Sequence, residues 1–398
     1  MQNLSRLLLI AVLAIGSAFG AQPARKLGEI NVVVDANTIP VRVSAGSAEL
    51  QTPALNAFDA HGRYRRVTSG HSYDIKFTAV GPTQVRVDVT KGAAAEPVVS
   101  QVVSGTTVRQ ALFRAADVAV EKTNGTGLRG FFTARLAFVS QRGGRGDIFF
   151  SDLFLGEAKQ LTHDNALTLS PRWAPDGSRI IYTSYYKNGA PDIYLHDPNT
   201  GRRDVFANYR GTNSGARFSP NGQQVAMVLS GTGTPEIYVS NAQGRNAVAR
   251  TRSDASKSSP CWSPDGSQIV FSMGEPLPQL YIMSAAGGAA RRIATGYSFS
   301  AEPDWNRTDR NKLACTVRVS GGKFQIAVVD VATGQTKVVS KANFDAVEPS
   351  WLADGRHLVY TARDKTTSVL CILDTETGRS TPLGQTSSAA LQASVWTP

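Results

Sequence analysis

The stretch Ser259-Pro260-Cys261-Trp262-Ser263-Pro264-Asp265-Gly266 decides the fold, because versions of it return along the chain. Trp173 is followed by Ala174-Pro175-Asp176-Gly177, and Trp351 is followed by Leu352-Ala353-Asp354-Gly355. All five tryptophans and one phenylalanine stand at steps of 45, 44, 43, 46 and 45 residues, at Trp173, Phe218, Trp262, Trp305, Trp351 and Trp396. A period in the forties is typical of the blades of a β-propeller.

The Pro-Asp-Gly segment predicts a tight turn after each of these aromatic residues. Proline presets φ, aspartate bonds back to its own backbone, and glycine accepts the positive φ that other residues resist. A strand is therefore expected to end near each of these aromatic residues, and the chain then reverses direction. Near Trp305 the turn sequence has changed to Asn306-Arg307-Thr308-Asp309.

Short segments rich in β-branched and aromatic residues follow each turn and predict further strands. The second strands of the repeats are Arg135–Ser140, Arg179–Ser184, Gln224–Ser230, Gln268–Met273, Lys312–Val317 and His357–Ala362. The third strands are Asp147–Ser151, Asp192–Leu195, Glu236–Val239, Gln279–Met283, Gln325–Asp330 and Val369–Asp374. With a fourth strand such as Arg202–Ala207, each period makes one antiparallel blade.

The count of second strands predicts a mainly β fold, a six-bladed β-propeller over residues 131–398 with a small N-terminal α/β domain before it. The first blade lacks its own Trp-bearing strand. Residues 394–398 have the missing pattern, so we expect the C-terminal strand to complete that blade. Closing the ring removes an open sheet edge that would invite aggregation.

The N-terminus predicts export. Arg6 precedes an apolar run from Leu7 to Ile15, and small residues at 18 and 20 suit a signal peptidase, so residues 1–20 are expected to be a signal peptide cleaved after Gly20. The run is too short for a finished membrane helix, and no later segment approaches a membrane span. We therefore expect the mature protein to be exported and soluble.

Residues 21–130 lack the repeat and predict the α/β domain. Its expected strands are Ile30–Val34, Tyr73–Val80, Gln84–Thr90 and Val98–Val103. Thr107 is expected to cap a helix over Val108–Lys122, which Asn124-Gly125 would end. The polar segment from Gly62 to Gly70 is expected to be a loop.

Composition narrows the classes of partner and chemistry. The formal net charge is +11, but no block of lysine or arginine forms a nucleic-acid arm, so no nucleic-acid partner is expected. The excess charge favours either an acidic partner or simple solubility. Cys261, Cys315 and Cys371 lie in strands of different repeats, and three buried thiols are favoured over one disulfide with a free thiol.

The sequence carries no motif for catalysis or for a cofactor. There is no Gly-x-Ser-x-Gly nucleophile elbow, and we expect no catalytic residue, cofactor or metal ion. The five histidines are scattered without metal-ligand spacing and are expected at the surface or at strand ends: His61, His71, His163, His196 and His357. Arg145-Gly146-Asp147 spells an adhesion tripeptide, but its place in a blade hairpin favours a structural role. The tryptophans are expected to pack between sheets; stacking on a sugar or base is the alternative.

The chain resembles the TolB family, the periplasmic propellers of the Tol–Pal system. The resemblance rests on the order of domains, on the joint Thr126-Gly127-Leu128-Arg129-Gly130-Phe131-Phe132-Thr133-Ala134-Arg135, on the six repeats, and on the ending Trp396-Thr397-Pro398. It implies a non-enzymatic scaffold that supports envelope integrity and cell division. It further implies that a Pal-like peptidoglycan-associated lipoprotein binds at the propeller mouth and that a TolA-like inner-membrane protein binds the N-terminal segment.

The mouth loops of that family precede each Trp-bearing strand. Carried onto this sequence, the expected partner-binding residues are Thr212, Asn213, Ser258, Ser259, Glu302 and Glu348. Ser259 stands where the family often has an acidic residue. Glu302 and Glu348 both precede a proline, and each either accepts hydrogen bonds from a partner or serves as a local turn carboxylate.

Two other functions remain open at the level of sequence. One is a periplasmic propeller that binds carbohydrate or muropeptide, for which a tryptophan ring would have to be exposed. The other is a lyase or hydrolase with an unrecognised site, whose mark would be titratable groups with shifted pKa values along the channel.

Overall fold

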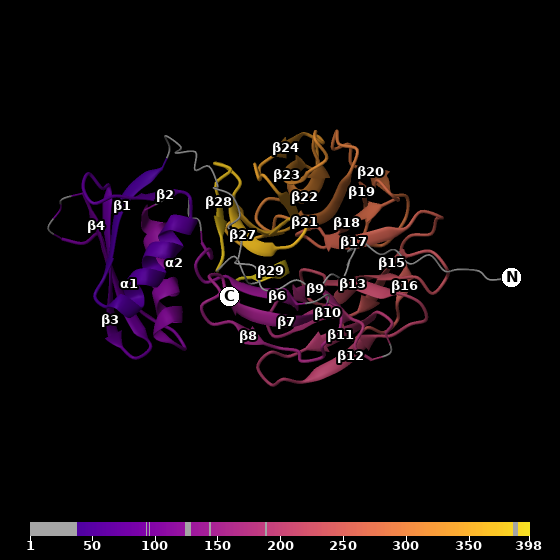
Figure 1. Cartoon of the computed structure of the whole chain (residues 1–398), viewed down its shortest axis with the longest axis horizontal. Helices are drawn as coiled ribbons and strands as arrows, with labels where there is room; N and C mark the ends of the chain where they lie inside the picture. The colour runs from indigo at the N-terminus through magenta and orange to yellow at the C-terminus, as the bar shows by residue number, and fades with distance from the viewer. Residues whose placement is uncertain are drawn as a thin grey trace.

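The computed structural model describes residues 38–398 apart from 93, 95, 124–128, 143–144, 188 and 385–388. The expected signal peptide, the expected strand Ile30–Val34 and the expected helix end at Asn124-Gly125 lie outside the described residues. A small α/β region stands to the left in Figure 1, and a ring of sheets stands beside it.

The ring consists of six four-stranded antiparallel sheets, which confirms the six-bladed propeller. Five of the sheets follow one another along the chain; the first two consist of β9 (Thr168–Trp173), β10 (Ile180–Ser184), β11 (Asp192–His196) and β12 (Arg203–Ala207), and of β13 (Asn213–Phe218), β14 (Gln224–Leu229), β15 (Glu236–Asn241) and β16 (Val248–Ala249). The third and fourth consist of β17 (Lys257–Trp262), β18 (Gln268–Met273), β19 (Gln279–Ser284) and β20 (Arg291–Arg292), and of β21 (Ser300–Trp305), β22 (Lys312–Arg318), β23 (Phe324–Asp330) and β24 (Thr336–Val338). The fifth consists of β25 (Asp345–Trp351), β26 (His357–Arg363), β27 (Ser368–Asp374) and β28 (Ser380–Pro382).

The sixth sheet joins the two ends of the propeller, as the sequence predicted. It consists of β29 (Ala390–Trp396), β6 (Arg135–Arg142), β7 (Arg145–Asp152) and β8 (Lys159–Gln160), in that order. Trp396 pairs with Arg135 and Val395 with Leu136. In the other sheets the repeated aromatic residue pairs with the second strand in the way that Trp173 pairs with Ile180. In the sixth sheet the residue equivalent to Ile180 is Leu136, and its partner is Val395 rather than Trp396.

Four of the five tryptophans are buried and pack between blades, as expected, whereas Trp396 is partly buried. Trp173, Trp262 and Trp351 are each 4% exposed. The indole N–H of Trp262 donates to the Arg217 carbonyl (3.0 Å), and that of Trp351 donates to the Asp304 carbonyl (3.0 Å), in each case on the preceding blade. Burial on both faces of the ring leaves no room for a stacked sugar or base.

The N-terminal region is a five-stranded sheet with two helices. Its strands are β1 (Ile39–Ala45), β2 (Tyr64–Arg66), β3 (Tyr73–Gly81), β4 (Gln84–Lys91) and β5 (Val99–Ser104), in the order β2-β1-β3-β4-β5, and its helices are α1 (Ala48–Ala60) and α2 (Val108–Thr123). The backbone N–H of Gln110 donates to Thr107 Oγ1 (3.1 Å), which confirms the expected cap.

Two features of this region were not foreseen. Helix α1 contains Pro53 in its interior, and its N-cap residue Ser47 makes no side-chain cap bond, so local signals for a helix are weak. Burial of Leu50, Ala54 and Phe58 on one face stabilises it instead. The prediction of a loop from Gly62 to Gly70 is wrong in part, because β2 forms there and pairs in parallel with β1.

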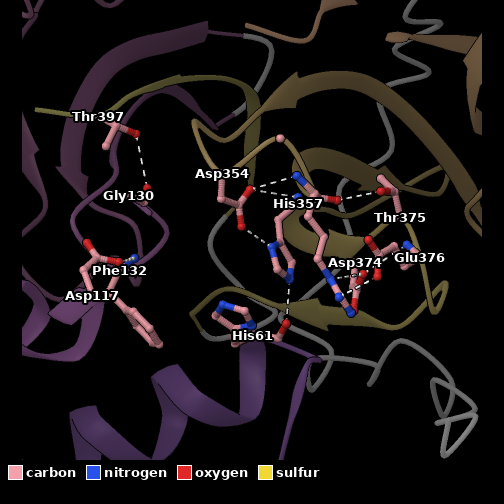
Figure 2. A network of polar contacts seen from close by, with 12 residues as sticks. His61, Asp117, Gly130, Phe132, Asp354, His357, Asp374, Thr375, Glu376 and Thr397 are labelled. Atoms are coloured by element: carbon pink, nitrogen blue, oxygen red, sulfur yellow. Dashed lines mark hydrogen bonds and ion pairs between the residues drawn. The ribbon is translucent and has the colours of Figure 1, made fainter. Parts of the chain in front are cut away.

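The N-terminal region packs against the propeller at the sheets β25–β28 and β29-β6-β7-β8, sharing one hydrophobic core with them. Polar contacts reinforce this interface: Arg109 Nε donates to Asp152 (2.9 Å), and the carboxylate of Asp117 accepts the backbone N–H of Phe132 (3.1 Å). Figure 2 shows further contacts between His61 and the turn that holds His357. We propose that the boundary between the two domains lies between residues 130 and 131.

Candidate functional site at the propeller mouth

The mouth of the propeller is the face at which each blade's second-to-third-strand hairpin meets the loop that enters that blade. Backbone hydrogen bonds join hairpin to loop: Tyr185 N–H to the Leu167 carbonyl (2.9 Å), and Gly274 N–H to the Ser256 carbonyl (3.0 Å). In an antiparallel blade the two remaining turns lie at the opposite end of the strands. The described contacts of the N-terminal region, at Asp152, Glu157 and His357, are on those turns, so that region leaves the mouth uncovered.

The entering loops are held by polar residues at the start of the third strands. Asp147 accepts hydrogen bonds from Thr162 Oγ1 (2.7 Å) and from the backbone of Asp164 (3.1 Å). Gln325 likewise bonds Ser340 Oγ (2.7 Å). Satisfied polar anchors of this kind preorganise loops before a partner arrives. They also support the structural role expected for Asp147 in the Arg-Gly-Asp tripeptide.

An ion pair anchors one of these loops especially firmly. Lys257 Nζ lies 2.8 Å from Glu236 Oε1, and the two side chains are 1% and 5% exposed. The same carboxylate accepts the backbone N–H of Ser253 (2.7 Å). Because a buried charge without its partner is strongly destabilising, each residue of this pair depends on the other.

A ring of six residues lines the channel below the mouth, one from each innermost strand. All have positive φ, at a point where the strand register shifts: Ser170 (52°), Gly215 (62°), Ser259 (52°), Glu302 (57°), Glu348 (57°) and Gln392 (55°). Positive φ is uncommon outside glycine, and bulges of this kind re-aim side chains next to functional surfaces. We call these six residues the channel ring.

Hydrogen bonds run from residue to residue around part of the channel ring. The backbone N–H of Glu348 donates to Glu302 Oε2 (2.9 Å), the side-chain amide of Gln392 donates to Glu348 Oε1 (3.0 Å), and the backbone N–H of Ser170 donates to Gln392 Oε1 (2.7 Å). Thr316 and Thr361 add a hydroxyl donor to Glu302 (2.6 Å) and to Glu348 (2.8 Å). These side chains therefore tie neighbouring blades together.

Titratable side chains lie at two levels along the inner strands. Burial raises the pKa of Glu302, and the neighbouring Glu348 carboxylate raises it further. Deeper inside, Arg217 forms an ion pair with Asp304 from another blade. Burial lowers the pKa of the nearby Arg172. Titratable groups with shifted pKa values along the channel are what the enzyme hypothesis predicts, but structural ion-pair networks shift pKa values in the same way.

The predicted partner-binding residues occupy different environments. Asn213 is buried, and its side-chain amide donates to the Tyr209 carbonyl (2.7 Å), which fixes its own loop. Ser258 is exposed, whereas Thr212 and Ser259 are partly buried. Glu302 and Glu348 belong to the channel ring and bond within the chain. For all six residues, binding of a partner stays a prediction.

A basic rim around the mouth was not predicted from the sequence. Exposed cationic side chains on the described loops and strand ends of this face are Arg145, Lys187, Arg210, Arg252, Arg318, Lys323, Lys341 and Lys365. Among the described residues of the same segments, the exposed acidic side chains are Asp254, Glu275 and Asp364. A surface with this imbalance attracts anionic partners. The residues are scattered in sequence, and only the ring brings them to one face.

Two other expectations concern cysteines and histidines. Cys261, Cys315 and Cys371 are free and buried, as expected. His61, expected at the surface or at a strand end, is fully buried, and His357 lies at a strand end as expected but is also fully buried; the two lie together on the face opposite the mouth. With Asp354 they form the one group of three in the described part of the chain whose side chains are close enough to share a metal ion. No helix among the described residues is long and apolar enough to cross a membrane.

Comparison with known sequences identifies relatives of the propeller. A family model described as the TolB beta-propeller domain matches residues 123–398. The Tol-Pal system protein TolB of Bordetella pertussis is 31% identical over 185 residues, which cover 46% of this chain and 42% of that protein. Its counterpart in Bordetella parapertussis is 31% identical over 185 residues, covering 46% and 41%. The match thus spans under half of these curated relatives.

Comparison with solved structures supports the fold. TolB from Acinetobacter baumannii superposes with a TM-score of 0.78 at 21% identity, covering 90% of this chain and 96% of that chain. A putative TolB from Agrobacterium tumefaciens superposes with a TM-score of 0.50 at 17% identity, covering 67% and 98%. At these identities the likeness concerns architecture alone.

Proposed function

Because the chain belongs to the TolB beta-propeller family, we propose that it is a periplasmic, non-enzymatic scaffold of a Tol–Pal system. Its propeller mouth binds a Pal-like peptidoglycan-associated lipoprotein, and its N-terminal segment meets a TolA-like inner-membrane protein. The relatives in Bordetella are named as Tol-Pal system proteins, which supports the assignment of the system. In this role the protein supports envelope integrity and cell division.

The observation that carries the proposed binding site is the uncovered, preorganised mouth. Its loops are anchored by Asp147, Glu236 and Gln325, and the N-terminal region packs at the other end of the strands. A surface made of preorganised loops loses little conformational entropy when it binds, which favours recognition of a protein partner. The buried tryptophans do not favour the carbohydrate-binding alternative.

The basic rim narrows the chemistry of the partner. A lipoprotein that docks over exposed Arg210, Arg252 and Lys341 presents acidic side chains at the edge of its contact surface. Polar donors of the partner then lie toward the carboxylates of Glu302 and Glu348 at the centre. Charge pairs at a rim act mainly on the association rate and make it sensitive to salt.

A binding measurement with the mature chain tests the proposal. The probe is the soluble domain of the peptidoglycan-associated lipoprotein from the same cell, and the readout is Kd and the association rate by biolayer interferometry. The triple variant Arg210→Glu, Arg252→Glu, Lys341→Glu is expected to weaken binding by about tenfold or more, mainly through slower association. Association of the wild type is expected to slow as the salt concentration rises from about 50 to 200 mM.

Arg245→Glu is the matched control, because Arg245 is an exposed arginine on a turn at the opposite end of a blade. It should leave Kd within about twofold of the wild type, since charges beyond a Debye length are screened. Absence of binding to the lipoprotein would refute the proposed partner. Equal losses in the triple variant and in the control would refute the proposed face.

A further inference from the structure

The cluster of His61, Asp354 and His357 lies where helix α1 meets the turn that leads into β26 (Figure 2). His357 Nδ1 is 2.5 Å from Asp354 Oδ2, and His357 Nε2 is 2.5 Å from the carbonyl oxygen of His61. The rings of His61 and His357 are 4.7 Å apart between centroids. Both histidines are 0% exposed, and they come from opposite sides of the interface between the N-terminal region and the propeller.

The hydrogen bonds of His357 require a proton or a cation between its ring and Asp354. A carbonyl oxygen only accepts, so the Nε2 atom that faces the carbonyl of His61 carries a hydrogen. In the neutral ring the other nitrogen, Nδ1, then has a lone pair, and it faces a carboxylate oxygen that also only accepts. Either a second proton or a metal ion must lie between Nδ1 and the carboxylate.

The state of His61 distinguishes these two possibilities. Neither ring nitrogen of His61 has a hydrogen-bond partner, although the residue is fully buried. A proton shared by His357 and Asp354 would leave both His61 nitrogens unpaired, and buried polar groups without partners are costly. A metal ion bound by all three residues would engage one of them.

We propose that His61, Asp354 and His357 form a binding site for a divalent first-row transition metal ion such as Zn²⁺. Two imidazoles and one carboxylate are typical ligands of such ions, and ions that prefer all-oxygen sites are excluded by this set. The three ligating atoms lie within 4.8 Å of one another. With metal–ligand distances of about 2.0–2.2 Å in a tetrahedral site, Nδ1 and Oδ2 must separate from 2.5 Å to about 3.4 Å when the ion replaces the proton.

The surroundings provide the contacts that orient metal ligands. The bond from His357 Nε2 to the His61 carbonyl fixes the tautomer that presents Nδ1, as second hydrogen bonds of ligating histidines do. The other oxygen of Asp354 accepts the backbone N–H groups of Arg356 (3.1 Å) and His357 (3.0 Å). The nearby charge of Arg356 is paired with Asp374 (2.6 Å) and Glu376 (2.6 Å), so it does not oppose the ion.

The site is buried and has its ligands on two parts of the chain, so the ion acts as a structural staple between them. His61 holds the end of helix α1, whereas Asp354 and His357 belong to the propeller sheet β25–β28. Because the ligands are buried, the ion enters when the interface opens or when the chain folds. A structural ion contributes its binding free energy to the stability of the folded chain.

The test uses the full mature chain, stripped with a chelator and then refolded with or without Zn²⁺. We expect one ion per chain by elemental analysis and a rise in Tm of about 4 °C or more at saturating metal. Refolding with Co²⁺ should give the visible absorption of a low-symmetry nitrogen- and oxygen-ligated centre. No bound ion, no change in Tm and no such absorption would together overturn the proposal.

His61→Phe is the discriminating variant, because a phenyl ring suits the contacts of His61 with Tyr64 and Phe131 and removes both unpaired nitrogens. The stripped variant should melt at or above the Tm of the stripped wild type, but it should neither bind the ion nor gain stability from it. His163→Asn, at an exposed histidine far along the chain, should keep the full response. An equal rise in Tm for His61→Phe and the wild type would refute the assignment, and the Co²⁺ spectrum of the wild type decides if the variant fails to fold.

Discussion

Asp117 lies at the interface between the N-terminal region and the propeller, and its protonation is expected to change the stability of the fold. Burial raises the pKa of its carboxyl to about 6, although Thr133 and the backbone N–H of Phe132 donate to it. A raised folded pKa means that this group's stabilising contribution is present below the ordinary value of 3.8 and is lost as the pH rises through about 6.

Asp117→Asn removes this titration. Relative to the variant, the wild type should lose free energy of unfolding between pH 4 and pH 7, by about 3 kcal/mol for the two or so pKa units involved. Denaturant unfolding of both proteins at four pH values measures the difference. Asp204→Asn, at an exposed carboxylate, is the control and should track the wild type. A difference between wild type and Asp117→Asn that is constant with pH would contradict the prediction.

Gly177 is a second residue whose environment makes a sharp prediction. It has φ +68°, and a Cβ placed on it would lie 2.3 Å from the ring of Trp396. Gly222 occupies the same turn position one blade later, at φ +71°, with nothing within 4 Å of such a Cβ. Both changes to alanine pay the cost of positive φ, but only Gly177→Ala also displaces an aromatic ring.

We therefore expect Gly177→Ala to cost about 2 kcal/mol more free energy of unfolding than Gly222→Ala. Chemical denaturation of the two variants and the wild type gives the comparison. Equal losses would show that the ring of Trp396 moves aside freely, contrary to the tight contact in the structure.

At the scale of elements, strand β29 is the one on which closure depends. It pairs with β6 over Ala390–Trp396, and the Trp396 indole donates to the Pro175 carbonyl of the neighbouring blade (2.9 Å). Without β29, the inner edge of β6 and the flank of β9 face water. Unpaired edges of this kind recruit other chains.

Deletion of residues 390–398 should therefore lower Tm by more than 10 °C, an order-of-magnitude expectation for loss of a whole buried strand, and produce aggregates on size-exclusion chromatography. Deletion of Pro398 alone is the control and should leave both properties near those of the wild type. A monomeric truncated chain with unchanged Tm would argue against closure by β29.

Most elements of the propeller follow from local chemistry. The Pro-Asp-Gly turns and the strands after them were predictable because a turn and its two strands are set by adjacent residues. The spacing of the aromatic residues was misleading in the sixth sheet, since Val395 rather than Trp396 has the register of Trp173. Trp396 instead packs over Gly177, a contact between residues that no local pattern connects.

At the scale of the whole molecule, what escaped prediction depends on distant residues. Helix α1 is stabilised by packing against the sheet rather than by its own caps, so its sequence gives little signal. The channel ring takes one residue from each blade, and the basic rim gathers residues from several blades. The cluster of His61 and His357 joins positions 296 residues apart. Ring closure and domain docking create these sites, and one sequence read in short windows does not contain them.

The pairing of β29 with β6 also governs when this protein can become functional. Strand β6 leaves the ribosome early, but its partner follows only after the five intervening sheets have been made. Until then the inner edge of β6 has no partner strand, and the nascent chain cannot close its ring of sheets. A prematurely terminated product would therefore remain an open ring with an unpaired strand edge.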